Sequence, residues 1–226
     1  MARSSGSKQT MQQKVYQELR RSLMVGAFVP GQNISLRKLA ESLQTSLMPV
    51  REAVNRLIAE RAFQMLPNRT VIIPTMDEEK LAELMYWRKV LEGASAEAAT
   101  TNISPRRLKK IEIINEELHR AVDDNELQLT LIKNQEFHFE IYEASKNTIL
   151  LPMIESLWLQ GGPFLYYSLS SPQVIWNGAH HLKAIQGLKK KDSAVVKSAI
   201  EDDIQNTADF LLKSHLFRRS SPRPIN

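Results

Sequence analysis

The sequence has no cysteine among its 226 residues, which excludes disulfide bridges, a thiolate nucleophile and cysteine-ligated zinc. It also has no apolar run of the length, about 18 residues, that a membrane-spanning helix needs. The first ten residues, MARSSGSKQT, lack the apolar segment of a secretory signal peptide. These absences predict a soluble protein of the cytoplasm that makes no contact with a membrane.

Several motifs of known enzyme classes are missing too. The sequence has no Gly-x-Ser-x-Gly nucleophile elbow, no glycine-rich phosphate loop and no His-Glu-x-x-His zinc motif. These absences favour a protein that is not an enzyme. Histidines do gather in the C-terminal half, at His119, His138, His180 and His181, and many carboxylates accompany them. A metal-dependent enzyme that uses these histidines is therefore one alternative.

Positive charge is concentrated in the first third of the chain. Residues 1–75 contain eleven Lys and Arg against four Asp and Glu, a net of +7. Residues 76–226 contain nineteen against twenty-one, a net of −2, and the two parts give the +5 of the whole chain. This asymmetry is typical of a nucleic-acid-binding module joined to a nearly neutral one. A DNA-packaging protein without sequence preference is a second alternative. Such a protein would have no evident use for a large, nearly neutral domain such as residues 76–226.

Helical periodicity predicts a helix-turn-helix in the basic third. Apolar residues recur at four-residue steps before Gly26, so we expect a helix over about 10–25. A turn and a short extended stretch follow. Ser35 and Ser46 then each stand before a short segment with apolar periodicity, as helix N-caps do, and Pro49 is compatible with the first turn of the second segment. Two short helices joined by a tight turn form a helix-turn-helix.

The pattern changes from helical to extended after this motif. Phe63–Leu66 and Thr70–Ile73 flank the turn Pro67–Arg69, which predicts a β-hairpin wing. From Asp77 onward only helical patterns occur. The predicted helices span about 77–100, 104–123, 126–146, 148–170, 172–190 and 192–216.

The predicted fold class is therefore mainly α. A winged helix-turn-helix of three helices and a β-hairpin wing precedes an antiparallel all-α bundle of about six helices. The expected organisation is a disordered arm over 1–9, a DNA-binding domain over 10–75, a helical domain over 76–216 and a loose tail over 217–226.

Two runs of residues carry a resemblance to a known family. They are LRKLAESL at Leu36–Leu43 and MPVREAVNRL at Met48–Leu57, with GAFVPG at Gly26–Gly31 upstream. This pattern resembles the GntR superfamily of transcription regulators. The C-terminal helices are similar to the FCD domain of its FadR branch, and six of them, rather than seven, resemble the VanR subgroup. The resemblance implies a sequence-specific regulator whose operator affinity is modulated by a small-molecule effector in the C-terminal domain. We expect this regulator to be a repressor.

We expect the protein to act as a homodimer. One small DNA-binding module contacts too few base pairs for high specificity, and regulators of this kind bind two half-sites about one helical turn apart. The operator should therefore be an imperfect palindrome. The helix at 77–100 offers an interface, because it has more apolar residues than one core-facing stripe requires: Leu81, Leu84, Met85, Trp87, Val90 and Leu91. The alternative is that this helix lies inside the bundle.

Seven residues are predicted to contact DNA: Arg37, Ser46, Met48, Arg51, Asn55, Arg56 and Arg69. On the third helix the polar residues lie opposite the apolar stripe, so they are free to enter a major groove. The resemblance implies DNA contacts for Arg37 and Arg51. Ser46 can offer a hydroxyl and nearby backbone amides at a helix N-terminus, and Arg69 lies at the tip of the wing.

Leu47 and Met48 depart from the family pattern, which often has arginine and then threonine at these places. Neither side chain can donate bidentate hydrogen bonds to guanine, although both can contact a thymine methyl group. We therefore expect an operator that differs from the commonest sites of the family.

The C-terminal part carries a second resemblance. NQEFH at Asn134–His138 resembles the Asp-x-x-Phe-His motif of the FCD domain, whose aspartate and histidine lie one helical turn apart. In the same register His181 and Asp203 take the places of the second and third histidines. The resemblance thus implies that Asn134, His138, His181 and Asp203 hold a divalent metal, either zinc, nickel or manganese. The alternative is a polar pocket without metal.

The resemblance also points to effector-binding residues. Arg88 matches a family position near the same cavity, so Arg88, His138 and His181 are expected to bind the effector, with Arg88 holding a carboxylate. The alternative for Arg88 is an ion pair with Glu92, one turn later on the same helix.

Overall fold

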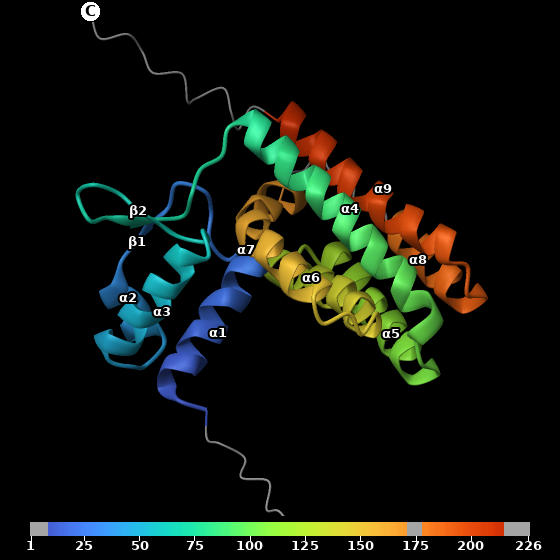
Figure 1. The fold of residues 1–226 in the computed structure, drawn as a ribbon, viewed down its shortest axis with the longest axis horizontal. Helices are drawn as coiled ribbons and strands as arrows, with labels where there is room; N and C mark the ends of the chain where they lie inside the picture. The colour runs from blue at the N-terminus through green and yellow to red at the C-terminus, as the bar shows by residue number, and fades with distance from the viewer. Residues whose placement is uncertain (1–8, 171–177, 215–226) are drawn as a thin grey trace, which may run out of the picture.

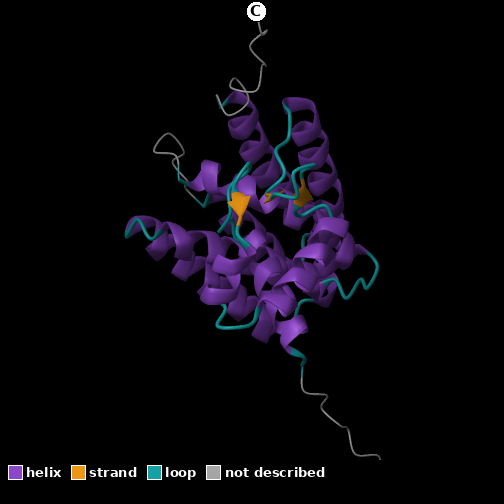
Figure 2. Cartoon of the chain, turned by 90° about the vertical axis from the view of Figure 1, so that its left-hand side faces the viewer, coloured by secondary structure: helices purple, strands orange, loops and turns teal. Residues whose placement is uncertain are grey.

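The computed structural model describes residues 9–170 and 178–214. Residues 1–8 of the predicted arm over 1–9, the predicted start of a helix at 172 and everything after 214 lie outside the described residues. Figure 1 shows α1, α2, α3 and the short strands on one side and the helices from α4 onward on the other. Figure 2 shows that helices make up most of the chain and that the strands are short.

The N-terminal domain is built on three helices. Helix α1 (Met11–Met24) begins at a capping box, in which Thr10 accepts a hydrogen bond from the Gln13 backbone and the Gln13 side chain accepts one from the Thr10 backbone. Helices α2 (Leu36–Ser42) and α3 (Leu47–Ala59) follow, and α3 packs on both α1 and α2. The buried side chains of α1 are Val15, Tyr16, Leu19, Leu23 and Met24.

A small antiparallel sheet completes this domain and confirms the predicted wing. Strands β1 (Asn33–Ile34), β2 (Gln64–Met65) and β3 (Val71–Ile72) lie in the order β1-β3-β2. In the turn between β2 and β3 the Arg69 N–H donates to the Leu66 carbonyl, 2.9 Å away. Arg69 itself adopts the left-handed backbone conformation, with φ of 63°, that a glycine more often takes.

Six helices form the C-terminal domain within the described residues. They are α4 (Glu78–Asn102), α5 (Pro105–Asp123), α6 (Leu127–Ala144), α7 (Leu150–Leu169), α8 (Ala179–Lys190) and α9 (Ser193–Lys213). Side chains of Asp77, Ser104 and Asp192 cap α4, α5 and α9 at the predicted places. Helix α4 runs along α9 (Figure 1) and also packs on α6 and α7, while Tyr86 and Trp87 on its remaining face are exposed.

The helix boundaries agree with the prediction to within two residues, apart from α8 and the C-terminal end of α9. A helix over 172–190 was expected, but α8 begins at Ala179 after Gly178, whose φ of 63° is left-handed. Residues 171–177 lie outside the described part of the chain, as do the last two residues of the expected helix over 192–216. None of the helices in the described part is both long and apolar enough to cross a membrane.

The two domains meet where the C-terminal end of α1 packs on α7. A Cβ atom at Gly162 would lie 2.2 Å from the Leu23 carbonyl oxygen and 2.9 Å from the Met24 Cα, so this contact needs glycine. One helical turn earlier on α1, Arg20 forms an ion pair with Glu155 of α7, with 2.7 Å between the nitrogen and the oxygen. The DNA-binding domain therefore rests directly on a helix of the C-terminal bundle.

Candidate functional site

The outer face of α3 carries three of the residues that were predicted to contact DNA. Met48, Arg51 and Asn55 are exposed and share one face, because steps of three and four residues bring helical side chains together. The opposite face of α3 is buried and consists of Val50, Ala53, Val54 and Leu57. The domain therefore presents the polar face of α3 to its surroundings, as a DNA-recognition helix requires.

Three further predicted contacts lie around α3. Arg37 is exposed on α2, and Arg69 is exposed at the tip of the wing. Ser46 is the N-cap of α3 but makes no side-chain cap hydrogen bond, so its hydroxyl is not used within the helix end. The contact of each with DNA stays a prediction.

Arg56 has protein partners on the side of α3 that faces α1. Its guanidinium lies 3.7 Å from the centre of the Tyr16 ring, and its Nε lies 3.2 Å from a Glu60 carboxylate oxygen. The side chain is still 61% exposed. Its predicted contact with DNA therefore competes with a cation–π contact and an ion pair.

In the C-terminal domain three of the four predicted metal ligands converge from three helices. The Nε2 atom of His138 on α6 lies 3.3 Å from one carboxylate oxygen of Asp203 on α9. The Nε2 atom of His181 on α8 lies 3.9 Å from the other oxygen. One ligand atom from each residue lies within 4.8 Å of the others, and both histidines are buried. Phe137 stacks on the His181 ring with 3.8 Å between the ring centres, which holds this imidazole in place.

The fourth predicted ligand, Asn134, lines the same cavity from α6, one turn before His138. The cavity has a volume of about 30 Å³, enough for a water molecule or an ion but not for an organic effector. Its lining consists of Met85, Arg88, Asn134, His138, Trp158, Leu165, Ser168, Leu169, Asp203, Ile204 and Thr207. The cavity thus brings Arg88 together with three of the four predicted metal ligands, Asn134, His138 and Asp203.

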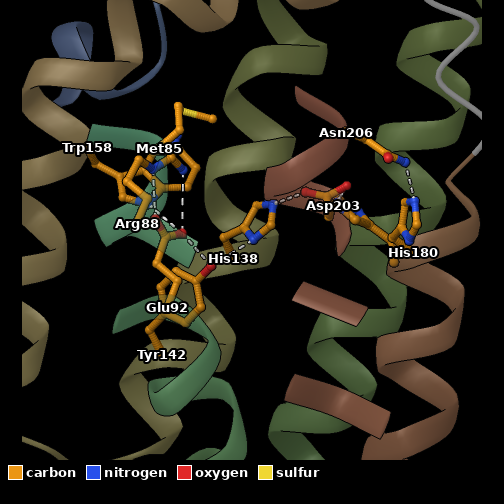
Figure 3. Close-up of polar contacts among 10 residues, drawn as sticks. Met85, Arg88, Glu92, His138, Tyr142, Trp158, His180, Asp203 and Asn206 are labelled. Atoms are coloured by element: carbon orange, nitrogen blue, oxygen red, sulfur yellow. Dashed lines mark hydrogen bonds and ion pairs between the residues drawn. The ribbon is translucent and has the colours of Figure 1, made fainter. Parts of the chain in front are cut away.

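A buried chain of hydrogen bonds leads from Arg88 to His138 (Figure 3). The Nε atom of Arg88 donates to Glu92 at 2.7 Å, so the ion pair considered from the sequence is present. Glu92 also accepts hydrogen bonds from the Tyr142 hydroxyl at 2.6 Å and from the Trp158 indole N–H at 2.9 Å. The Tyr142 oxygen lies 3.0 Å from Nδ1 of His138. Effector-binding and metal-binding candidates are therefore parts of one network.

This network determines where the proton of His138 lies. Because Tyr142 donates its hydrogen to Glu92, the tyrosine oxygen accepts from His138, and Nδ1 must carry a hydrogen. In a neutral imidazole Nε2 then presents a lone pair to the Asp203 carboxylate, 3.3 Å away. A divalent metal placed between Nε2 and this oxygen would accept both lone pairs, so the geometry suits a pair of metal ligands.

Burial and charge set the protonation of the other ligands. Burial lowers the pKa of His181 to about 3, so its imidazole is neutral near pH 7 and suited to metal binding. Burial raises the pKa of Asp203, but the hydrogen bond with His138 and the nearby histidines outweigh this effect and hold the pKa at about 2. Burial, together with Glu92, raises the pKa of Tyr142 well above its usual value, so Tyr142 remains a hydrogen-bond donor.

Three members of the network were not among the predicted site residues. Glu92 was considered only as an alternative partner of Arg88. Tyr142 follows His138 by one helical turn, and this spacing was a signal that could have indicated it. Trp158 comes from α7 through tertiary packing, and no spacing in the sequence connects it to the other residues.

Helix α7 lines this cavity and also packs against α1 of the DNA-binding domain. Trp158 on α7 lines the cavity, and a Cβ atom at Gly161 would lie 3.5 Å from the Arg88 side chain. The next residue, Gly162, contacts the backbone of α1, and Glu155 on the same helix pairs with α1. A displacement of α7 would therefore move both the wall of the cavity and the surface on which α1 packs.

Two family matches account for most of the chain. Residues 11–73 match the bacterial regulatory proteins of the gntR family, and residues 83–206 match the FCD domain. The chain belongs to the GntR family of regulators. The predicted function, a DNA-binding transcription regulator with an effector-binding domain, is thereby confirmed, and the alternatives, an enzyme and a DNA-packaging protein, are not supported.

Relatives of this regulator include two proteins of Escherichia coli (strain K12). It is 27% identical over 205 residues to the HTH-type transcriptional regulator McbR, an alignment that covers 89% of this chain and 93% of McbR. It is 22% identical over 204 residues to the HTH-type transcriptional repressor RspR, covering 89% of each chain. These alignments extend through both domains.

Solved structures confirm the predicted fold class. The structure of E. coli McbR/YncC matches with a TM-score of 0.83 and 27% identity, covering 89% of this chain and 97% of that one. A GntR regulator from Rhodococcus sp. RHA1, only 17% identical, matches with a TM-score of 0.72 over 90% of this chain and 98% of its own. The fold therefore persists where sequence identity is low.

Proposed function

We propose that this regulator represses transcription by binding an imperfectly palindromic operator as a homodimer, and that a carboxylate effector with a divalent metal in the C-terminal pocket changes its affinity for DNA. Arg88, His138 and Asp203 line one cavity, and His181 lies beside His138 and Asp203, which supports this proposal. The description of the relative RspR as a repressor favours repression. We also propose a cytoplasmic location and no catalytic activity, because operator binding alone accounts for the function.

Four side chains would hold the metal. His138 and His181 supply imidazole nitrogens, Asp203 supplies a carboxylate and Asn134 supplies an amide oxygen. Nitrogen and oxygen ligands of this kind suit zinc, nickel or manganese. Because Asp203 is the single anionic ligand, a divalent ion bound here would keep a net positive charge and would attract an anionic effector. Because this site has one imidazole fewer than the family pattern, we expect it to bind zinc and nickel more weakly.

Arg88 is the proposed partner of the effector carboxylate. Its Nε is bonded to Glu92, but its Nη1 points to the Met85 sulfur at 4.0 Å, which is a weak acceptor. An incoming carboxylate would be a much stronger acceptor for this group. Since the cavity is only about 30 Å³, any organic effector must widen it, and a packed interior transmits such a change to its neighbours.

Helix α7 is the proposed route from the pocket to DNA. A displacement at Gly161 moves Gly162, which rests on the backbone of α1. Arg20 of α1 joins the same route, because it pairs at once with Glu155 on α7 and with Glu60 at the end of α3. Effector binding can thus change the position of α3 relative to the bundle.

The metal is tested on protein prepared without a chelator or a metal-affinity tag. Elemental analysis should find about one divalent ion per chain in the wild type and in His180→Ala, whose exposed imidazole contacts Asn206 instead. The double variant His138→Ala/His181→Ala should bind none. Equal metal content and equal effector response in all three proteins would contradict the proposed site.

The effector is tested with DNA selected by the full-length regulator from a random library. Acetate, succinate and citrate are titrated in the presence of zinc or manganese while the apparent Kd for DNA is measured. We expect at least one carboxylate to change the Kd of the wild type and to have little effect on Arg88→Lys, which keeps the charge but loses the planar fork. An unchanged Kd with every acid and either metal would count against a carboxylate effector.

The exposed part of α4 is the proposed dimer interface. Tyr86 and Trp87 are 55% and 47% exposed and pack edge to face, 5.3 Å apart. Aromatic residues of this kind are enriched in protein interfaces. Trp87→Arg should shift the regulator toward monomer in sedimentation velocity at micromolar concentration, whereas Leu182→Arg on α8, at a residue that is 45% exposed, should not. A Trp87→Arg protein that remains dimeric would exclude this face.

A further inference from the structure

The outer face of the recognition helix begins with two exposed apolar side chains. Met48 is 59% exposed and Leu47 is 40% exposed, and both lie in the first turn of α3. The next exposed residues of this face, Arg51, Glu52 and Asn55, are polar or charged. The pair therefore forms a small apolar surface at the end of the helix that leads into a DNA groove.

Helix geometry places Met48, rather than Leu47, at the centre of this face. At about 100° per residue, Met48 projects within about 60° of Arg51 and about 20° of Asn55, and it points away from the buried Leu57. Leu47 projects about 100° away from Met48, at the edge of the face. A surface that meets Arg51 and Asn55 must therefore also meet Met48.

The surroundings of the pair fit DNA. Arg37 on α2 and Arg51 on α3 are exposed, and residues 1–75 carry a net charge of +7, from eleven basic and four acidic side chains. The net positive charge of this domain attracts the phosphate backbone. Within the major groove, the apolar group that a base edge presents is the 5-methyl group of thymine.

We propose that Met48 reads the 5-methyl group of one thymine in each operator half-site, and that Leu47 covers the edge of this contact. Cytosine methylated at C5 carries the same group at the same place in the groove. At that position the regulator should therefore prefer 5-methylcytosine to cytosine. Arg51 and Asn55 then supply the hydrogen bonds that distinguish the neighbouring bases.

Burial of a single methyl group is worth about fourfold in affinity, so two half-sites together give roughly fifteenfold. The test starts from duplexes that the full-length regulator selects from random-sequence DNA. Each thymine is replaced symmetrically by deoxyuridine, which lacks only the methyl group, and Kd is measured by fluorescence anisotropy. We expect one position per half-site at which uracil weakens binding by roughly this factor. Replacing that thymine by cytosine should also weaken binding. Replacing the cytosine by 5-methylcytosine should then restore part of the lost affinity.

Variants assign the effect to a residue. Met48→Ala should bind the thymine and uracil duplexes equally well, whereas Arg51→Ala should weaken binding to both and keep their ratio. Because Met48 is exposed, its replacement should leave the thermal unfolding midpoint unchanged. A wild type that binds thymine and uracil equally at every position would overturn the proposal, and so would a Met48→Ala protein that keeps the preference. A wild type that selects no sequence at all would contradict operator binding as well.

Discussion

The regulator contains the same ion pair twice, in opposite surroundings. Arg56 and Glu60 on α3 have side chains that are 61% and 25% exposed, whereas Arg88 and Glu92 on α4 are 3% and 0% exposed. Both pairs have the i,i+4 spacing of a helical ion pair. At the surface such a pair is worth about 0–1 kcal/mol, but in the interior the loss of one partner leaves an unsolvated charge. The same i,i+4 spacing therefore gives two ion pairs of different energetic weight, and the difference comes from their burial.

The two domains also differ in whether their polar side chains are buried. Among the described residues, the buried polar and charged side chains all belong to the C-terminal domain: Arg88, Glu92, Ser95, Thr100, Asn115, Thr130, Asn134, His138, Ser145, Ser168 and His181. The buried side chains of the DNA-binding domain are apolar or aromatic. Burying polar groups costs free energy unless they are bonded, and most of these side chains are bonded, so the C-terminal domain can hold a polar binding site in its interior.

The largest effect is expected from the buried pair. Glu92→Gln keeps the volume but leaves the Arg88 charge without a counterion, so the free energy of unfolding should fall by about 3–5 kcal/mol. Glu97→Gln on the same helix breaks an exposed pair with Lys197, so its effect on stability should be small. Urea denaturation measures both. A Glu92→Gln protein as stable as Glu97→Gln would mean that the network around Arg88 contributes nothing to stability.

The sequence predicted features that local interactions determine. Asp77, Ser104 and Asp192 mark helix starts because a cap acts within one turn, and Asn134 and His138 share a cavity because one turn separates them. Features set by tertiary packing were not predictable. The position of Trp158 beside Glu92 depends on how α7 crosses α4, a relation between helices that no periodicity encodes.

The glycine pair of α7 shows the same limit. In sequence, Gly161 and Gly162 are equivalent residues in an apolar helix, yet each faces a different domain. Gly161 meets the Arg88 side chain and Gly162 meets the α1 backbone. The need for glycine at the second position follows only from the contact between the domains.

The junction between the domains offers the second comparison. Gly162→Ala places a Cβ 2.2 Å from the Leu23 carbonyl oxygen, so α1 must move away and stability should fall by about 3 kcal/mol. In Gly161→Ala the nearest atoms lie 3.5 Å away, an ordinary contact, and the gain in helix propensity should make the change neutral or stabilising. Calorimetry should show separate transitions for the two domains in Gly162→Ala alone. Matching unfolding profiles for the two variants would contradict a tight junction.

Acid should weaken the C-terminal domain through His181. Its pKa is about 3 in the folded protein and about 6.5 in the unfolded chain, so between these values the unfolded chain binds a proton that the folded protein does not. Stability from this group is therefore complete above pH 6.5 and is lost as pH falls, by about 2 kcal/mol at pH 5. Urea midpoints measured with a chelator at pH 7, 6 and 5 should show this slope in the wild type and in His180→Gln. His181→Gln should lack it, and an equal slope in all three would refute the assignment.

The exposed pair should give a smaller change in stability than the buried pair, the domain junction or His181. Arg56→Ala removes a surface ion pair and a cation–π contact with Tyr16, so the free energy of unfolding should fall by about 1 kcal/mol. Arg56 is also predicted to contact DNA, and the dependence of affinity on salt tests this separately. If Arg56 binds a phosphate, Arg56→Ala should lower the slope of log K against log salt by about one per half-site, while Arg51→Ala should cost about 1–3 kcal/mol of specific binding. A variant that loses stability but keeps the wild-type slope would show that Arg56 holds α1 against α3 and does not touch the phosphates.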